Sequence, residues 1–189
     1  MKKLFVLIML LVASQFLFAQ TTYVKVVDRQ TKYEQLTKQT STQCRFEDHN
    51  LPTLYGMQSR ELETSVRCVN ADGTVSYFYR ICTKEKKDVP STQALVAFDD
   101  FVELNQMLET MLEQEKSDRT SRKDYAENVY TTSDGFQLGY GTKNRNTDWF
   151  IVFGPYSEDR IYFENGTRLK DNFQKALKKV DELKKKNDK

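Results

Sequence analysis

The stretch ALVAFDDFVELNQMLETML, residues 94–112, decides the fold of this 189-residue chain. Its first five residues are a short apolar run typical of a β-strand, and Asp99 or Asp100 follows, where a carboxylate could cap a helix. The apolar residues after this point recur at helical spacing: Leu104, Met107, Leu108, Met111 and Leu112. Each of these side chains contributes about 1.5–3 kcal/mol when buried. We therefore expect a strand followed by a helix that lies on a sheet.

A similar pattern returns in RIYFENGTRLKDNFQKAL, residues 160–177. A shift of 65 residues aligns Leu104 with Leu169, although Met107 then meets Asn172, which interrupts the apolar stripe. The second stripe consists of Leu169, Phe173, Ala176, Leu177, Val180 and Leu183. We interpret the chain as a tandem of two β-rich units, each closed by a helix. The alternative is that any strand followed by an amphipathic helix would align this way.

Asp-Gly dipeptides predict two hairpins, because both positions of a tight hairpin turn favour residues that accept positive φ. Asp72-Gly73 lies between two β-rich runs, and Asp134-Gly135 lies 62 residues later in a similar setting. The run after Asp72-Gly73 is bulky on both faces, so we expect a central strand that is covered on both sides. Further strands are expected at residues 22–28, 54–58, 93–98, 148–156 and 157–163, and a polar tract that is irregular or partly extended at 29–50.

The predicted fold class is α+β, with antiparallel sheets and amphipathic helices on one face, arranged as a tandem of two ββββα-like units. We expect residues 20–118 to form the first unit and residues 119–189 the second. Each helix is expected to lie on the sheet formed by the residues just before it.

Residues 1–19 have the form of a secretory signal peptide, in the sequence MKKLFVLIMLLVASQFLFA. Lys2 and Lys3 precede an apolar run that is shorter than the roughly 20 residues of a membrane span, although an uncleaved anchor remains the alternative. The pattern resembles the signals of exported proteins of Gram-negative bacteria, which implies a periplasmic or extracellular location. Removal of Lys2 and Lys3 lowers the 29 basic residues to 27, which equals the 27 acidic residues. The mature chain is then neutral, which argues against nucleic acid as a partner, and no stable membrane span is expected in it.

Three cysteines remain after cleavage: Cys44, Cys68 and Cys82. Export would allow disulfides, but an odd number leaves at least one thiol free or paired outside the chain. A turn at Asp72-Gly73 would place Cys68 opposite Tyr77, so Cys68 and Cys82 do not face each other. The three cysteines could form one disulfide, or all three could be buried, unpaired thiols, and the sequence does not decide between these alternatives.

The only histidine, His49, lies five residues after Cys44 and beside Glu47 and Asp48. A thiol nucleophile with its base, or a metal site, could be imagined here, but the spacing matches no known zinc pattern. We interpret the segment as a polar loop. The acidic pairs Asp99-Asp100 and Glu158-Asp159 are also interpreted as structural, the first as a helix cap and the second as a turn.

The chain has none of the common motifs for nucleotide, metal or nucleophile sites. We therefore expect a protein without catalytic, cofactor-binding or metal-ligating residues, and hence not an enzyme. The candidate ligand-binding residues are three tyrosines on predicted strands, Tyr77, Tyr79 and Tyr140, because an exposed aromatic sheet can stack on bases or sugars or can seat a peptide. The alternative is that these rings form the core. GYGT, residues 139–142, is expected to let a neighbour pack close to the backbone.

Several strands followed by one helix, twice over residues 60–183, resemble the ββββα units of the Whirly and transcriptional-coactivator fold. The resemblance implies paired units that bind single-stranded DNA on their sheets. It rests on element order alone, so no residue is transferred from that family, and export argues against its activity.

The preferred hypothesis is an exported, non-catalytic protein that binds another protein or a cell-envelope component on its sheet surface. The alternatives are a nucleic-acid-binding module of the Whirly type and a secreted hydrolase that uses carboxylates or Cys44.

Overall fold

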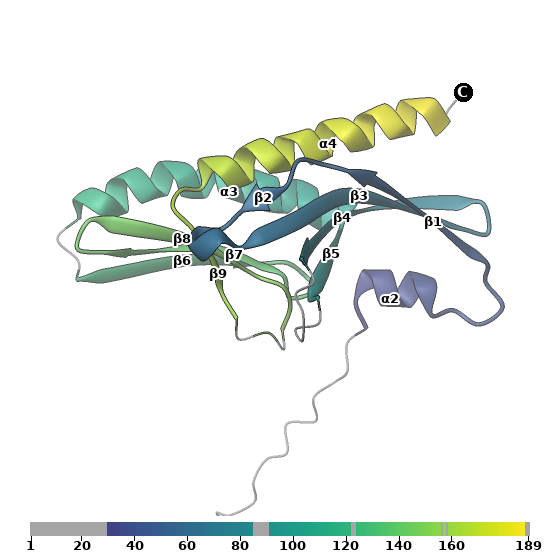
Figure 1. The fold of residues 1–189 in the computed structure, drawn as a ribbon, viewed down its shortest axis with the longest axis horizontal. Coiled ribbons are helices and arrows are strands. Elements are labelled where there is room, and N and C mark those ends of the chain that lie inside the picture. The colour runs from purple at the N-terminus through teal and green to yellow at the C-terminus, as the bar shows by residue number, and fades with distance from the viewer. Residues whose placement is uncertain (1–29, 85–90, 122–123, 156, 158, 188–189) are drawn as a thin grey trace, which may run out of the picture.

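The computed structural model describes residues 30–84, 91–121, 124–155, 157 and 159–187. The fold is α+β, as predicted: two antiparallel sheets lie beneath two long helices (Figure 1). The proposed signal peptide at 1–19 and the strand expected at 22–28 lie outside the described residues. Among the helices that are described, none combines the length and the apolar character that a membrane crossing requires.

The first sheet has the strand order β1-β3-β4-β5, with the short β2 paired to β3. Its strands are β1 (Cys44–Asn50), β2 (Leu54–Tyr55), β3 (Glu61–Ala71), β4 (Thr74–Thr83) and β5 (Gln93–Ala97), and a short 3₁₀ turn, η1 (Met57–Ser59), follows β2. Asp72 and Gly73 close the β3–β4 hairpin with φ angles of 47° and 89°. Cys68 lies opposite Tyr77, so the predicted turn and register are both confirmed.

The second sheet is a meander of four strands, β6 (Tyr125–Thr131), β7 (Gln137–Lys143), β8 (Asn146–Val152) and β9 (Ile161–Phe163). The hairpin predicted at Asp134-Gly135 joins β6 to β7. Asp72-Gly73 joins the second and third strands in the order of the first sheet, β3 and β4. In the second sheet the second and third strands, β7 and β8, are joined by Asn144-Arg145, with φ angles of 51° and 68°. The shift of 62 residues therefore aligns two turns that occupy different places in their sheets.

Two long helices, α3 (Phe98–Thr120) and α4 (Thr167–Asn187), cover one side of both sheets (Figure 1). Helix α3 contacts β4 and β5 of the first sheet and also β6, β7 and β8 of the second. Helix α4 packs on α3 and on β2 and β3 of the first sheet. The expectation that each helix lies on the sheet before it is therefore incomplete for α3 and wrong for α4. One hydrophobic core contains residues of both sheets and both helices, and the division at residue 118 remains a prediction.

The opposite side of the first sheet is covered by a short helix, α2 (Lys32–Thr37). Thr31 and Glu34 form a capping box at its start. The ring of Tyr33 meets Phe78 of β4 edge-on, at 5.3 Å between centroids. The central strand β4 is thus covered on both faces, as predicted. The tract at 29–50 is extended in part, at β1, which agrees with the prediction. It also contains α2, which the sequence does not predict, because a capped six-residue helix is too short to show an apolar period.

Asp99 and Asp100 do not cap α3, which begins at Phe98 after Ala97, a residue without a capping side chain. Asp100 lies in the first turn, where a carboxylate is favourable to the helix dipole. It accepts hydrogen bonds from Lys32 Nζ at 2.7 Å and from Ser133 Oγ at 2.6 Å. Asp100 therefore links α2, α3 and the loop between β6 and β7.

Candidate functional site

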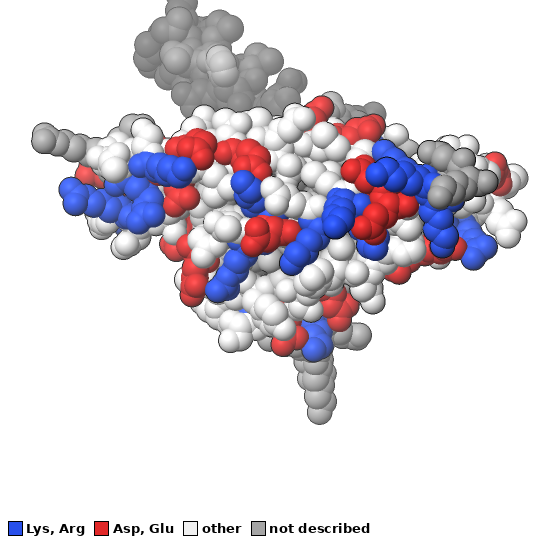
Figure 2. Space-filling model, turned by 90° about the horizontal axis from the view of Figure 1, so that it is seen from above, with Lys and Arg blue, Asp and Glu red and all other residues white. Residues whose placement is uncertain are grey.

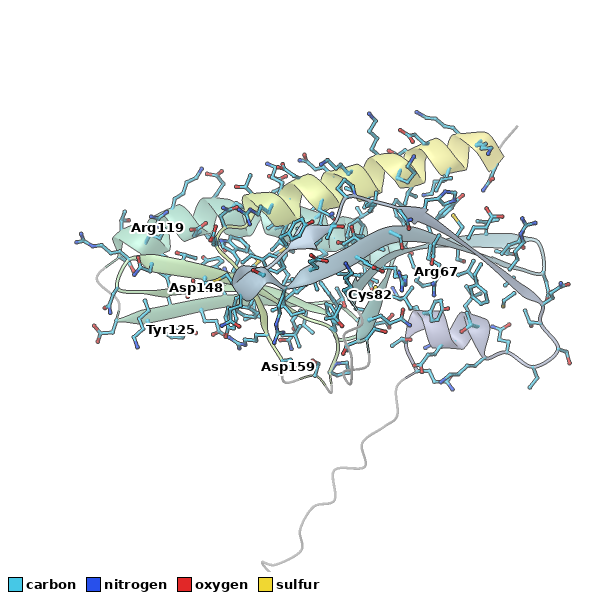
Figure 3. The ribbon with its side chains drawn as sticks, viewed as in Figure 1. Arg67, Cys82, Arg119, Tyr125, Asp148 and Asp159 are labelled. Atoms are coloured by element: carbon cyan, nitrogen blue, oxygen red, sulfur yellow. The ribbon has the colours of Figure 1, made fainter. Side chains whose placement is uncertain are left out.

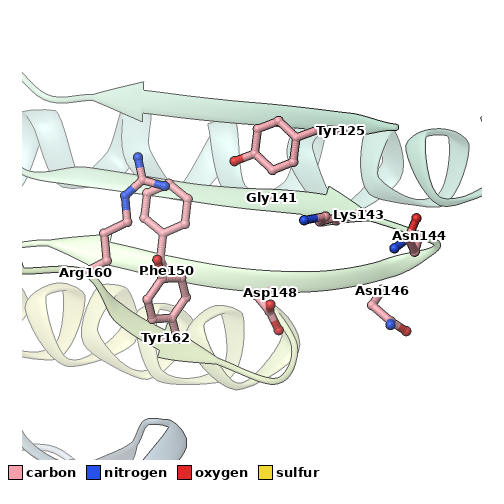
Figure 4. A pocket seen from close by; sticks show the side chains of 9 residues that line it. All are labelled: Tyr125, Gly141, Lys143, Asn144, Asn146, Asp148, Phe150, Arg160 and Tyr162. Carbon is pink, nitrogen blue, oxygen red and sulfur yellow. The ribbon is translucent and has the colours of Figure 1, made fainter. Parts of the chain in front are cut away.

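In the described part of the chain, only one face of the second sheet is covered by a helix. Helix α3 packs on one side of it, and no described helix packs on the other, whereas α2 covers the matching side of the first sheet (Figure 1). The uncovered side holds a hollow of about 350 Å³, which we call the open-face groove (Figure 4). Its lining residues are Tyr125, Gly141, Lys143, Asn144, Asn146, Asp148, Phe150, Arg160 and Tyr162.

Two glycines of β7 shape the floor of the groove. A Cβ atom at Gly139 would lie 2.6 Å from Cζ of Phe150, and one at Gly141 would lie 3.1 Å from the hydroxyl of Tyr125. Each glycine therefore accepts an aromatic ring from the neighbouring strand, β8 or β6, over its bare backbone. The expectation for residues 139–142 is confirmed.

The guanidinium of Arg160 lies over the ring of Phe150, at 4.0 Å from its centroid. The same group donates two hydrogen bonds to Glu127, at 3.0 Å to Oε2 and 2.9 Å to Oε1. The hydroxyl of Tyr125 donates to Glu127 as well. Glu127 thus holds both an arginine and a tyrosine in place, and the ion pair is of the bidentate kind that fixes geometry most firmly.

These contacts set the charge states in the groove. The hydrogen bonds from Arg160 and then from Tyr125 lower the pKa of Glu127. The hydrogen bond that Arg160 donates to Glu127 raises the pKa of Arg160. The hydrogen bond that Tyr125 donates to Glu127 raises the pKa of Tyr125 in the same way. At neutral pH Glu127 is therefore a carboxylate, and Tyr125 keeps its proton.

The rim of the groove offers unused polar groups. Lys143, Asn144, Asn146 and Asp148 are exposed, and their side chains form no hydrogen bond or ion pair with another residue in the described part of the chain. Tyr125 and Tyr162 are also exposed, with 55% and 41% of their residue surfaces accessible. The groove can therefore offer aromatic faces, amides and charges of both signs to a ligand.

The tyrosines predicted to bind a ligand lie elsewhere. Tyr77, Tyr79 and Tyr140 are buried beneath α3 and α4, so the expectation of rings exposed on the sheet surface is wrong. Tyr140 donates to Asp118 at 2.7 Å, and burial followed by this bond raises its pKa to about 12. The sequence shows that tyrosines alternate along strands, but only the placement of the helices decides which face stays open.

Cys44 and His49 do not form a catalytic pair. They lie five residues apart on β1, which places them on opposite faces of the strand and about 16 Å apart at 3.3 Å per residue. Cys44 packs beside Tyr33 and Leu36 on the α2 side. All three cysteines are free thiols.

The structure instead brings His49 close to Cys68, in a smaller hollow of about 150 Å³ that also contacts the end of α4. Burial raises the pKa of the Cys68 thiol to about 11, so this group is protonated at neutral pH. No cluster of three or more possible metal ligands occurs among the residues described.

The open-face groove lies on the second sheet, and this second hollow lies between the first sheet and the end of α4. Tyr125 and Asp148 of the groove lie toward one end of the molecule, and Arg67, which precedes Cys68 on β3, lies toward the other (Figure 3). On the face formed by the helices, acidic and basic side chains are interspersed (Figure 2), with ion pairs such as Lys170–Glu109 at 2.6 Å.

No family model, curated protein or solved structure matches this chain, so its function is inferred from the site itself.

Proposed function

We propose that this chain is an exported, non-catalytic binding protein and that the open-face groove is its binding surface. The N-terminal residues have the form of a signal peptide, which supports a partner in the cell envelope or outside the cell. The partner class is a cell-envelope component or another exported protein.

One observation carries the proposal: the two sheets differ on the side away from α3 and α4. In the first sheet α2 covers this side, and Phe78 is only 3% exposed. In the second sheet the same side is hollowed and carries two exposed tyrosines. Exposed aromatic residues around a concave surface are typical of binding sites rather than of idle surface.

The state of Glu127 favours binding over acid–base catalysis. A general acid or base works best when its pKa lies near the working pH. Arg160 occupies both carboxylate oxygens of Glu127 and lowers its pKa, which moves this group away from such a role. The same ion pair holds Arg160 over Phe150 before any ligand arrives, and a preformed surface reduces the cost of ordering on binding.

A pull-down with the mature protein, residues 20–189, from its own envelope fraction tests the proposal. We expect the wild type to retain a component that Tyr125→Ala/Tyr162→Ala fails to retain. Tyr55→Ala is the matched control, because Tyr55 is 52% exposed but lines a hollow beside α4. The proposal fails if the double variant retains the same component as the wild type.

A further inference from the structure

We propose that the open-face groove binds an uncharged saccharide. The inference rests on the proposed function and gives its ligand a chemical class. It follows from the charge balance, the aromatic rings and the unused polar groups of the groove.

The charges in and beneath the groove cancel. Arg160 and Lys143 supply two positive charges, and Glu127 and Asp148 supply two negative ones. Arg160 is already paired with Glu127, so it offers little net attraction to an anion. A site for a polyanion such as single-stranded DNA would need an excess of positive charge along the groove. The balance instead favours a ligand without charge.

The aromatic rings suit the C–H faces of a sugar. The phenol end of Tyr125 lies over the bare backbone of Gly141, where a Cβ atom would come within 3.5 Å of Cε2 and 3.7 Å of Cζ. The ring is thereby held against the sheet, and Figure 4 shows its face turned toward the groove opening. The π face of an aromatic ring is electron-rich and attracts polarised C–H bonds. Tyr162 of β9 lies beside Phe150, at 6.1 Å between ring centroids, and offers a second ring (Figure 4).

The polar groups at the rim suit hydroxyl groups. The carboxylate of Asp148 is an acceptor, the amides of Asn144 and Asn146 offer both donors and acceptors, and Lys143 is a donor. A sugar hydroxyl can donate and accept at once, so it can pair with each of these groups. An apolar ligand would leave them unpaired, and each unpaired group would cost affinity.

The size of the groove sets a limit on the ligand. A hollow of about 350 Å³ lies at the lower end of the range of ligand sites, about 300–1,000 Å³. The groove therefore takes a short segment of a glycan, and the rest of the chain would extend into solvent.

Amide NMR of the mature protein with neutral oligosaccharides tests the class of ligand. The probes are hexamers of glucose, mannose, galactose and N-acetylglucosamine at millimolar concentration, with oligo-dT as the charged probe. We expect at least one hexamer to shift the amides around Tyr125, Gly141, Asp148 and Tyr162, with an affinity that does not change when salt rises from about 50 to 500 mM. Tyr125→Ala/Tyr162→Ala should weaken this binding at least about tenfold, and Tyr55→Ala should leave it unchanged.

The outcomes separate the two proposals. If no hexamer shifts these amides, or if oligo-dT alone does so, the saccharide inference is overturned. If the saccharide inference is overturned but the double variant still fails to retain the envelope component, the groove remains the binding surface and only its ligand class is wrong. If the double variant retains both the hexamer and the envelope component, both proposals fail.

Discussion

The hydroxyl of Tyr79 donates a hydrogen bond of 2.8 Å to Oδ1 of Asn172, which joins strand β4 of the first sheet to helix α4. The amide of Asn172 donates in turn to the carbonyl of Pro52 at 3.0 Å and to Oγ1 of Thr64 at 3.1 Å. Asn172 is 5% exposed, so these bonds form inside the core. The residue that interrupts the apolar stripe of α4 thus holds this helix on the first sheet and not on the sheet that precedes it.

We expect Asn172→Leu to lower the free energy of unfolding by about 1–3 kcal/mol, because it leaves the Tyr79 hydroxyl buried without an acceptor, whereas the Pro52 carbonyl still accepts from Oγ1 of Thr64 at 3.0 Å. Urea denaturation measures the change. Tyr79→Phe and the double variant complete a mutant cycle, in which the two changes should be clearly non-additive. Additive effects would mean that the bond between these side chains does not couple β4 to α4.

Gly139→Ala should destabilise the protein by about 1–3 kcal/mol, because the new methyl group would meet Phe150 at 2.6 Å and the carbonyl of Asn128 at 2.8 Å. Gly154→Ala is the control, since nothing lies within 4 Å of a Cβ atom there. That change should stay within about 0.5 kcal/mol. Thermal unfolding compares the two variants, and equal melting temperatures would contradict the packing described for β7 and β8.

The sequence alone predicts many of the local elements of this fold, although it misses α2 and the turn at Asn144-Arg145. The Asp-Gly turns, the register around Cys68 and the two amphipathic helices follow from turn chemistry and residue spacing, which are properties of short segments. The α+β class follows from these elements. The packing of α4 on the first sheet does not, because it depends on Asn172 meeting Tyr79, two residues far apart in the sequence.

The candidate site is predicted less well. The sequence shows the glycines at 139 and 141 as places for close packing, and this holds. It does not show that α2 covers one sheet and leaves the other open. Helix α2 is short, and its position depends on hydrogen bonds from Lys32 to Asp100 and Asp134, which lie far away in the sequence. Nor does the sequence show which face of each sheet α3 and α4 cover, so Tyr79 and Tyr140, which these helices bury, are not told apart from an exposed residue such as Tyr125.

The ion pair between Glu127 and Arg160 should stabilise the fold at neutral pH and not in acid. The pKa of Glu127 is lowered in the folded state, so its contribution is present above the unfolded value of about 4.3 and is lost as pH falls through the folded value. The pair is partly exposed, at 35% for Arg160 and 26% for Glu127, which limits the effect to about 0.5–1 kcal/mol. Glu127→Gln should therefore lower the free energy of unfolding at pH 7, and the difference from wild type should shrink below pH 4. A difference that grows in acid would contradict this assignment.

Cys68 should react slowly with alkylating agents. With a pKa of about 11, about one thiol in a thousand is ionised at pH 8, and the thiolate is the reactive form. Mass spectrometry after iodoacetamide treatment should find Cys68 largely unmodified in the folded protein and fully modified in urea. Rapid modification of the folded protein at this residue would show that burial does not protect it.

Photo-crosslinking tests the open-face groove as the binding surface most directly. The photoreactive residue p-benzoylphenylalanine is placed at position 162 in the groove or at position 55 beside α4, and the cells that make the protein are irradiated. We expect an adduct of higher mass from position 162 and none from position 55. An adduct from position 55 alone, or equal adducts from both positions, would contradict this expectation.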